Sequence, residues 1–195
     1  MQFEIKMRII SGTSRGRKLG TLKNNIIRPT SDRVKESIFN ILGKEVEGKI
    51  VLDLFAGTGS LGIEALSRGA RSVLFVERGR QALRLIKKNL SQCGMEGQSE
   101  ILPKDVYRAI GILRQRGKSF DLILMDPPYE QGLIQKALKK LDSEKIYHKD
   151  SILVIEHDRR EPLPDVTGRW DLIRQRRIGD TVVSFLKSCL FTIEV

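Results

Sequence analysis

The chain has 195 residues, of which 40% are hydrophobic, and this suits one domain with a small appendage and excludes a disordered chain. No apolar run approaches the length of a membrane-spanning helix, and residues 1–8 lack the apolar stretch of a signal peptide, so we expect a cytoplasmic protein. The formal net charge of +11 favours a polyanion as the partner.

The N-terminal segment is the most basic part of the chain. Residues 1–35 contain nine lysines and arginines and two acidic residues, which gives +7 of the total charge. Residues 7–27 read as short strands interrupted by Ser11-Gly12 and Arg15-Gly16. A solvated basic face is the alternative interpretation, but so strong a concentration of charge favours contact with nucleic acid, with Arg15, Arg17 and Lys18 as phosphate ligands.

The following segment predicts a helix. Pro29 interrupts the secondary structure that precedes it, and Thr30 or Ser31 can cap a new helix. Its apolar residues fall on one helical face, and they are Val34, Ile38, Ile41 and Leu42. We expect Gly43 or Gly48 to end it.

Strand and helix alternate over most of the remaining chain. Apolar runs predict strands over 50–55, 73–76, 101–102, 120–125 and 152–155. Helical spacing predicts helices over 61–66, 82–90, 106–113 and 133–141. Because the strands are continuous apolar runs, we predict a parallel sheet covered on both faces, which is a doubly wound α/β fold.

The last segment departs from this alternation. Residues 170–178 and 181–193 flank the turn signal Gly179-Asp180, and no helix separates them. These two segments therefore predict an antiparallel hairpin at one edge of the sheet.

The first candidate site is a glycine-rich turn between a strand and a helix. Gly57 and Gly59 allow a tight turn and close approach to a ligand, and the helix start supplies unpaired N–H groups. Glu77 ends the next strand, where its carboxylate could accept both hydroxyls of an adenosine ribose. A purely structural turn is the alternative, but the strand, glycines, helix and distal acid all stand in register.

Asp53 distinguishes between two cofactors that this turn could hold. Gly57, Gly59 and Gly62 also satisfy G-x-G-x-x-G, which is typical of NAD sites. A carboxylate beside the turn would repel a pyrophosphate, whereas it could neutralise the ammonium of S-adenosylmethionine. Asp53 therefore favours S-adenosylmethionine, unless it only bonds to loop N–H groups.

The second candidate site is Asp126-Pro127-Pro128-Tyr129, just past the fourth predicted strand. Two prolines stiffen the loop and remove two N–H donors, so the neighbouring carbonyls and the Asp126 carboxylate form a cluster of acceptors. Such a cluster matches an amino group with two N–H donors, and Tyr129 offers a flat face for stacking a planar base. A rigid exit turn with a packed tyrosine is the alternative.

Five motifs together resemble one family. They are Arg15-Gly-Arg-Lys-Leu19, Arg28-Pro-Thr-Ser-Asp-Arg-Val-Lys-Glu36, Asp53-Leu-Phe-Ala-Gly-Thr-Gly-Ser60, Asp126-Pro-Pro-Tyr129 and Gly179-Asp-Thr181. Over nearly its whole length the chain resembles the bacterial 16S ribosomal RNA guanine-N2 methyltransferases. The resemblance implies a Rossmann-like fold with a mostly parallel seven-stranded sheet that ends in an antiparallel hairpin. It also implies a basic β-hairpin extension over residues 1–30, which binds RNA, and an S-adenosylmethionine-dependent methyltransferase domain over residues 31–195.

The resemblance further implies methyl transfer to the exocyclic N2 of one guanine in 16S rRNA, on an assembled or assembling small ribosomal subunit. The implied catalytic residues are Asp126, Pro127, Pro128 and Tyr129. The implied cofactor-binding residues are Asp53, Phe55, Ala56, Gly57, Thr58, Gly59, Glu77, Arg78, Asp105, Val106 and Asp126. Arg15, Arg17, Lys18, Arg28 and Arg33 are the expected RNA-binding residues, and Thr30 should lie near the cofactor or the RNA.

Three other functions remain open at this point: a DNA adenine-N6 methyltransferase, an NAD-dependent oxidoreductase, and a non-catalytic RNA-binding protein with the same fold. His148 and His157 have no metal-ligand spacing to Cys93 or Cys189, so we expect no metal site. The two distant cysteines also predict no disulfide framework. We expect a monomer.

Overall fold

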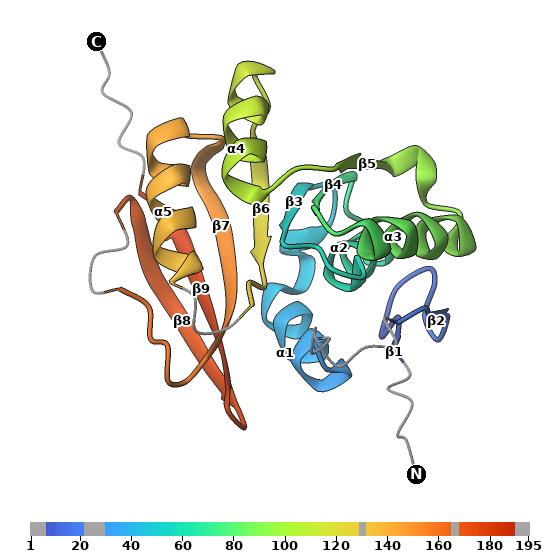
Figure 1. Ribbon diagram of the computed structural model, residues 1–195. Helices are drawn as coiled ribbons and strands as arrows, with labels where there is room; N and C mark the ends of the chain where they lie inside the picture. The colour runs from blue at the N-terminus through green and yellow to red at the C-terminus, as the bar shows by residue number, and fades with distance from the viewer. Residues whose placement is uncertain (1–6, 22–29, 129–131, 165–167, 190–195) are drawn as a thin grey trace.

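A seven-stranded sheet forms the centre of the fold, with the strand order β5-β4-β3-β6-β7-β9-β8 (Figure 1). The computed structural model describes residues 7–21, 30–128, 132–164 and 168–189. The strands are β3 (Ile50–Leu54), β4 (Ser72–Val76), β5 (Ser99–Leu102), β6 (Phe120–Met125), β7 (Tyr147–Asp158), β8 (Trp170–Ile178) and β9 (Thr181–Ser188). Strands β3 to β7 pair in parallel, and β9 is antiparallel to both β7 and β8.

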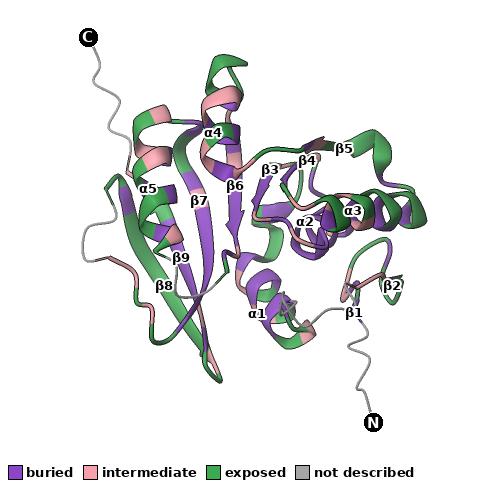
Figure 2. Cartoon of the chain, viewed as in Figure 1, coloured by how far each residue is buried: buried purple, intermediate pink, exposed green. Residues whose placement is uncertain are grey.

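Helices cover both faces of the sheet. On one face, α1 (Asp32–Leu42), α2 (Ser60–Ser67) and α3 (Arg80–Cys93) enclose one buried apolar cluster. On the other, α4 (Val106–Gln115) and α5 (Leu133–Glu144) enclose a second. The short 3-10 helices η1 (Gly43–Val46) and η2 (Glu96–Gln98) lead toward strands. Figure 2 shows the central strands buried and the outer helix faces exposed. Within the described residues, no helix has the length and apolarity to span a membrane.

A separate two-stranded pair precedes the sheet. β1 (Met7–Arg8) and β2 (Lys18–Leu19) are antiparallel, with Met7 opposite Leu19. Met7, Ile9 and Leu19 are buried in the same apolar cluster as helices α1 to α3. The predicted N-terminal hairpin is therefore present, and its apolar side chains belong to the main core.

The structure confirms the parallel sheet, the five predicted helices and the terminal hairpin around Gly179-Asp180. Ser31 caps α1 by accepting a hydrogen bond from the Val34 N–H at 3.3 Å, and the Gly43 N–H closes its other end. Both cysteines are free. The predicted strand 152–155 is too short, because β7 begins five residues earlier. Residues 148–150 are exposed and polar, so no apolar run marked this part of the strand.

The parallel register brings three strand ends to one edge of the sheet. Leu54 at the end of β3 pairs with Val76 at the end of β4 and with Met125 at the end of β6. The residues that follow these strands therefore meet at the carboxyl edge, where ligands bind in open α/β sheets. This edge holds the candidate site.

Candidate cofactor and substrate site

The glycine-rich turn after β3 depends on several left-handed residues. Gly57 has φ 55°, and Gly59, which precedes α2, has φ 78°. Phe55 is not glycine yet has φ 62°, a conformation that costs a non-glycine residue energy and that often occurs at functional sites. A Cβ on Gly62 would lie 2.3 Å from the buried ring of Phe75, so α2 can lie this close to the sheet only with glycine there. Nothing in the sequence marked Phe55 as left-handed.

Asp53 is a buried carboxylate directly beneath this turn. Its side chain is 1% exposed, and its Oδ2 accepts a hydrogen bond from the Gly62 N–H at 3.0 Å. Burial raises the pKa of Asp53 to about 8, against the lowering effect of the Gly62 bond and with smaller contributions from the charges of Asp126 and Glu77. Asp53 therefore lies close enough to Asp126 and to Glu77 to be repelled by both.

Glu77, which follows β4, holds the same turn from the side. Its Oε2 accepts from the Gly57 N–H at 2.9 Å. Its Oε1 accepts from the N–H groups of Arg78 and Gly79 at 2.8 and 2.6 Å. One acceptor position remains, on Oε2, because each oxygen has two and the three N–H groups occupy the others. Glu77 thus shapes the loop whether or not a ribose lies on it, while the Arg78 side chain is exposed.

Asp105 and Val106 follow β5 at the same edge. Asp105 caps α4 through a hydrogen bond from the Arg108 N–H to its Oδ1 at 3.1 Å, and Val106 is buried. The other oxygen of Asp105, Oδ2, lies 3.6 Å from the Nε of Arg108, whose side chain is well exposed. A cap and a ligand contact are compatible roles for this side chain.

Asp126 begins the turn after β6. Its Oδ2 accepts a hydrogen bond from the Thr30 hydroxyl at 2.5 Å, and Thr30 itself is 4% exposed. Burial raises the pKa of Asp126 to about 6, against the lowering effect of the Thr30 bond. Pro127 is buried and Pro128 is exposed, while Tyr129 lies outside the described residues. The sequence identified Thr30 as a possible helix cap, but Ser31 is the cap and Thr30 bonds to Asp126.

Comparisons with known proteins show the family of the chain. A family model described as "Conserved hypothetical protein 95" matches residues 7–187. The chain belongs to this family. It is 39% identical to the "Putative rRNA methyltransferase YlbH" of Bacillus subtilis over 93% of this chain and 98% of that protein. It is 33% identical to the "Ribosomal RNA small subunit methyltransferase D" of Escherichia coli K12, over 89% and 86% of the two chains.

A solved structure, "Putative methyltransferase yhhF from Escherichia coli", superimposes with a TM-score of 0.81 and 31% identity. The match covers 94% of this chain and 98% of that one. The fold of this member of the conserved hypothetical protein 95 family is therefore the Rossmann-like methyltransferase fold, as the sequence predicted. The NAD-dependent oxidoreductase is not favoured, because the relatives named here are methyltransferases.

In this family member, the predicted RNA-binding residues lie on the surface where they are described. Arg15, Arg17, Lys18 and Arg33 are exposed, and Arg28 lies outside the described residues. Arg17 also donates to the Gln92 carbonyl near the end of α3 at 2.6 Å. Lys35, which we counted with the basic N-terminal segment, is buried. Its ammonium donates to the Arg8 carbonyl at 2.6 Å and pairs with Asp32 at 3.3 Å, so it is no surface charge.

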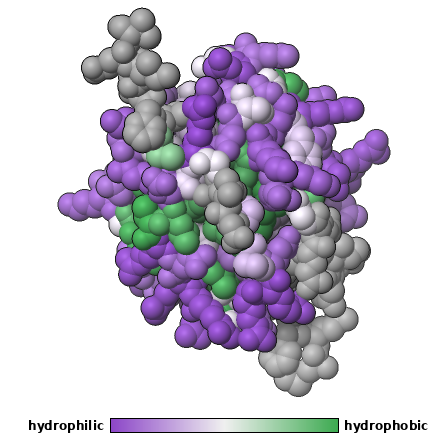
Figure 3. All heavy atoms as spheres, turned by 90° about the vertical axis from the view of Figure 1, so that its left-hand side faces the viewer, coloured by the Kyte–Doolittle hydropathy of each residue, from purple (hydrophilic) through white to green (hydrophobic). Residues whose placement is uncertain are grey.

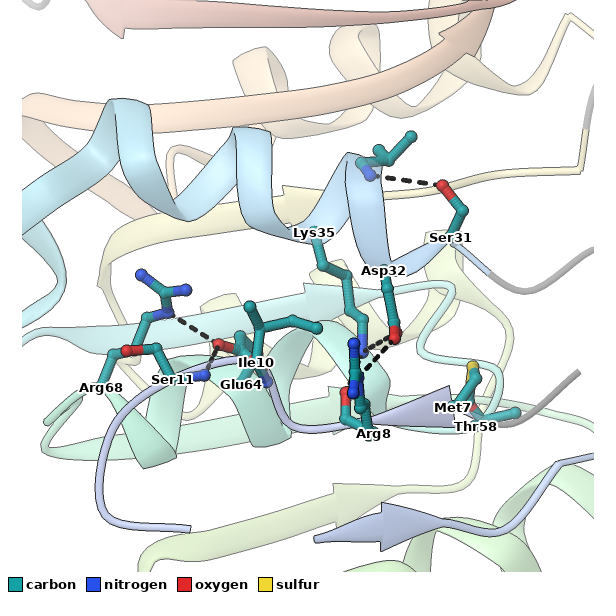
Figure 4. A network of polar contacts seen from close by, with 11 residues as sticks. Met7, Arg8, Ile10, Ser11, Ser31, Asp32, Lys35, Thr58, Glu64 and Arg68 are labelled. Carbon is teal, nitrogen blue, oxygen red and sulfur yellow. Dashed lines mark hydrogen bonds and ion pairs between the residues drawn. The ribbon is translucent and has the colours of Figure 1, made fainter. Parts of the chain in front are cut away.

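A buried carboxylate joins the N-terminal extension to α2 (Figure 4). Glu64 is 0% exposed and accepts from the N–H groups of Ile10 and Ser11 at 2.7 and 3.0 Å. Arg68 pairs with the same carboxylate at 2.7 Å. No local pattern predicts this contact, because Glu64 reads as an ordinary helix residue in an apolar stretch.

Proposed function

We propose that the protein transfers a methyl group from S-adenosylmethionine to the exocyclic N2 of a guanine in 16S rRNA. The observation that carries the proposal is that β3 and β6 are neighbouring parallel strands with Leu54 opposite Met125, which sets Asp53 and Asp126 at adjacent strand ends. One carboxylate belongs to the glycine-rich turn and the other to the Asp-Pro-Pro turn, so a cofactor on the first turn and an amine on the second would share one site.

The residues present fit S-adenosylmethionine better than a dinucleotide. Asp53, Glu77 and Asp126 gather three carboxyl groups at the carboxyl edge, and among the described residues no lysine or arginine side chain pairs with any of them. Such a site favours a ligand with a positive charge and disfavours a pyrophosphate. Asp53 would hold the ammonium, Glu77 the ribose, and Asp105 with Val106 the adenine. The backbone of residues 55–59 and Arg78 would complete the cofactor site.

The bound cofactor supplies an electrophilic methyl group and a sulfur that leaves as a neutral thioether. The guanine amine is a weak nucleophile, because its lone pair is delocalised into the ring. Asp126 and the Pro127 carbonyl accept its two N–H groups, orient the nitrogen and stabilise the positive charge that develops there. One N–H proton is lost as the N–C bond forms, and Asp126 accepts it.

Thr30 prepares Asp126 for this role. Its hydroxyl occupies one oxygen of the carboxylate, which leaves the other oxygen for the amine. Pro127 and Pro128 keep the turn rigid, and Tyr129 stacks on the base once the base has left its helix.

Residues 1–30 form the RNA-binding extension in this proposal, and residues 31–195 form the catalytic domain. Arg15, Arg17, Lys18, Arg28 and Arg33 bind phosphates. The substrate is the small ribosomal subunit or its RNA, for which the Escherichia coli relative is named. We expect a cytoplasmic monomer that works without a metal ion.

The test is to incubate the protein and labelled S-adenosylmethionine with small subunits from cells that lack this activity, and to map the modified nucleotide. Label in DNA adenine, or no transfer to RNA, would overturn the proposal.

Asp126→Ala should retain cofactor binding and lower turnover by on the order of a hundredfold or more, the loss typical of a key electrostatic group. Asp121→Asn is the matched control, because Asp121 lies at the other end of β6, where its carboxylate accepts a hydrogen bond from the Ile50 N–H. Equal turnover in Asp126→Ala and the wild type would refute the assignment of Asp126.

A further inference from the structure

The outermost strand, β8, is unlike the rest of the sheet. Every residue from 171 to 177 is exposed, whereas the central strands are almost wholly buried (Figure 2). Figure 3 shows the side of the molecule where β8 lies, with a hydrophobic patch among mostly hydrophilic side chains. Leu172 and Ile173 on β8 are 49% and 55% exposed. A strand of this kind either meets a partner or must be protected from one.

Three of the exposed β8 residues are arginines. Among the described residues, the side chains of Arg174 and Arg176 form neither an ion pair nor a hydrogen bond, and Arg177 donates only to the Gly179 carbonyl at 3.0 Å. Two neighbouring arginines are already neutralised, since Arg159 pairs with Asp180 at 3.0 Å and Arg160 with Asp158 at 2.9 Å. The charge of residues 174–177 therefore remains available to an anion.

The position of these arginines relates them to the candidate site. Because β9 is antiparallel to β7, with Thr181 opposite Asp158, the turn between β8 and β9 lies at the carboxyl end of β7. This is the edge where Asp126 follows β6. Strand β8 is three places from β6 in the sheet, or about 15 Å at the usual strand spacing.

The N-terminal extension lies on the opposite side of the site. It is bonded to α2 and α3 through Glu64 and Asn89, whereas the β8–β9 hairpin forms the other end of the sheet (Figure 1). Two separate basic surfaces thus flank the carboxyl edge. An RNA strand that touched both would cross the site between them.

The edge itself disfavours the addition of another protein strand. The register shifts between Leu172 and Arg174, which marks a β-bulge in the ladder. Bulges bend an edge strand and interrupt its pairing, and the arginines beyond it repel a second copy of so basic a chain. Charge complementarity favours a polyanion instead.

We propose that Arg174, Arg176 and Arg177 form a second phosphate-binding surface for the RNA whose base enters the site. This surface and the N-terminal extension hold the RNA on both sides of the target nucleotide. The inference rests on the proposed function for the identity of the RNA, but its test measures binding and needs no turnover.

The experiment compares two triple variants in filter binding to transcribed 16S rRNA over a series of salt concentrations. The first, the hairpin variant, carries Arg174→Gln, Arg176→Gln and Arg177→Gln. The control carries Arg114→Gln, Lys118→Gln and Lys145→Gln, which removes the same charge from exposed residues at the amino edge of the sheet. The hairpin variant should bind about tenfold more weakly or worse, and its salt slope should fall by about two, since each lost phosphate contact removes roughly 0.7–0.9.

Binding and salt slope that equal those of the control variant would overturn the proposal. It would also fail if the hairpin variant bound naked RNA as the control does but methylated assembled subunits poorly, because the hairpin would then contact a ribosomal protein. If the wild type transferred no methyl group to RNA, the proposed function would be contradicted, while the comparison of RNA binding between the two variants would still be valid.

Discussion

Replacing Thr30 by valine tests the electrostatics of the site most directly. Valine keeps the branched shape of threonine and removes only the hydroxyl that donates to Asp126 at 2.5 Å. Burial, which raises the pKa of Asp126 to about 6, would remain, while the hydrogen bond that lowers it would be lost. The pKa of Asp126 should therefore rise in Thr30→Val.

The size of the effect follows from the bond. A hydrogen bond to a charged group contributes about 1.5–3 kcal/mol, and about 1.4 kcal/mol corresponds to one pH unit. Asp126 must be ionised to accept the amine protons, so turnover should fall on the acidic side of its profile. That acidic limb should move to higher pH by about one to two units in the variant.

The assay is methyl incorporation at saturating cofactor and RNA, measured as turnover against pH. Thr30→Ser should keep the acidic limb of the pH profile where the wild type has it, because serine also has a hydroxyl. Ser31→Ala is a neighbouring control that removes the α1 cap, costs about 1 kcal/mol of stability, and should leave the limb in place. An acidic limb in Thr30→Val that coincides with that of the wild type would refute the role of Thr30.

Three further substitutions test other parts of the structure. The affinity for S-adenosylmethionine, measured by calorimetry, should rise by up to tenfold between pH 7 and 8, and Asp53→Asn should lose this rise. Without cofactor, Asp53→Asn should gain stability relative to the wild type as pH rises toward 8, because a carboxyl whose folded pKa is raised destabilises the fold increasingly between its unfolded pKa and about 8. Glu64→Gln should leave one of the two N–H groups of the extension without an acceptor, lower stability by about 1–3 kcal/mol, and speed hydrogen exchange at those amides. Gly62→Ala should destabilise the protein by about 1–3 kcal/mol in thermal melts, because its Cβ would meet the Phe75 ring, whereas Gly111→Ala, with open space around it, should be neutral or stabilising. Unchanged melting of Gly62→Ala would contradict the packing described here.

The sequence predicts the parts of this fold that depend on local patterns. Continuous apolar runs located the central strands, and Gly179-Asp180 located the hairpin turn. The glycine-rich turn and the Asp-Pro-Pro turn could be placed together at one edge, because parallel strands end on the same side.

What the sequence missed depends on contacts between distant residues. Thr30 and Asp126 are 96 positions apart, and no local pattern links a hydroxyl near a helix start to a strand end. Lys35 reads as one more basic surface residue, yet it is buried against the Arg8 carbonyl. Burial of a polar group depends on which partner the fold provides, and the partner here comes from another segment.

The bond between Glu64 and the extension limits how these enzymes can be recombined. An engineer who exchanged residues 1–30 for those of another methyltransferase, in order to redirect it to a new RNA, would cut through the hydrogen bonds of Ile10 and Ser11. Glu64 in the host helix would then have no backbone N–H group from which to accept a hydrogen bond, unless the new segment followed the same path. Successful chimeras should therefore carry α2 along with the transplanted segment, so that both sides of the joint come from one parent.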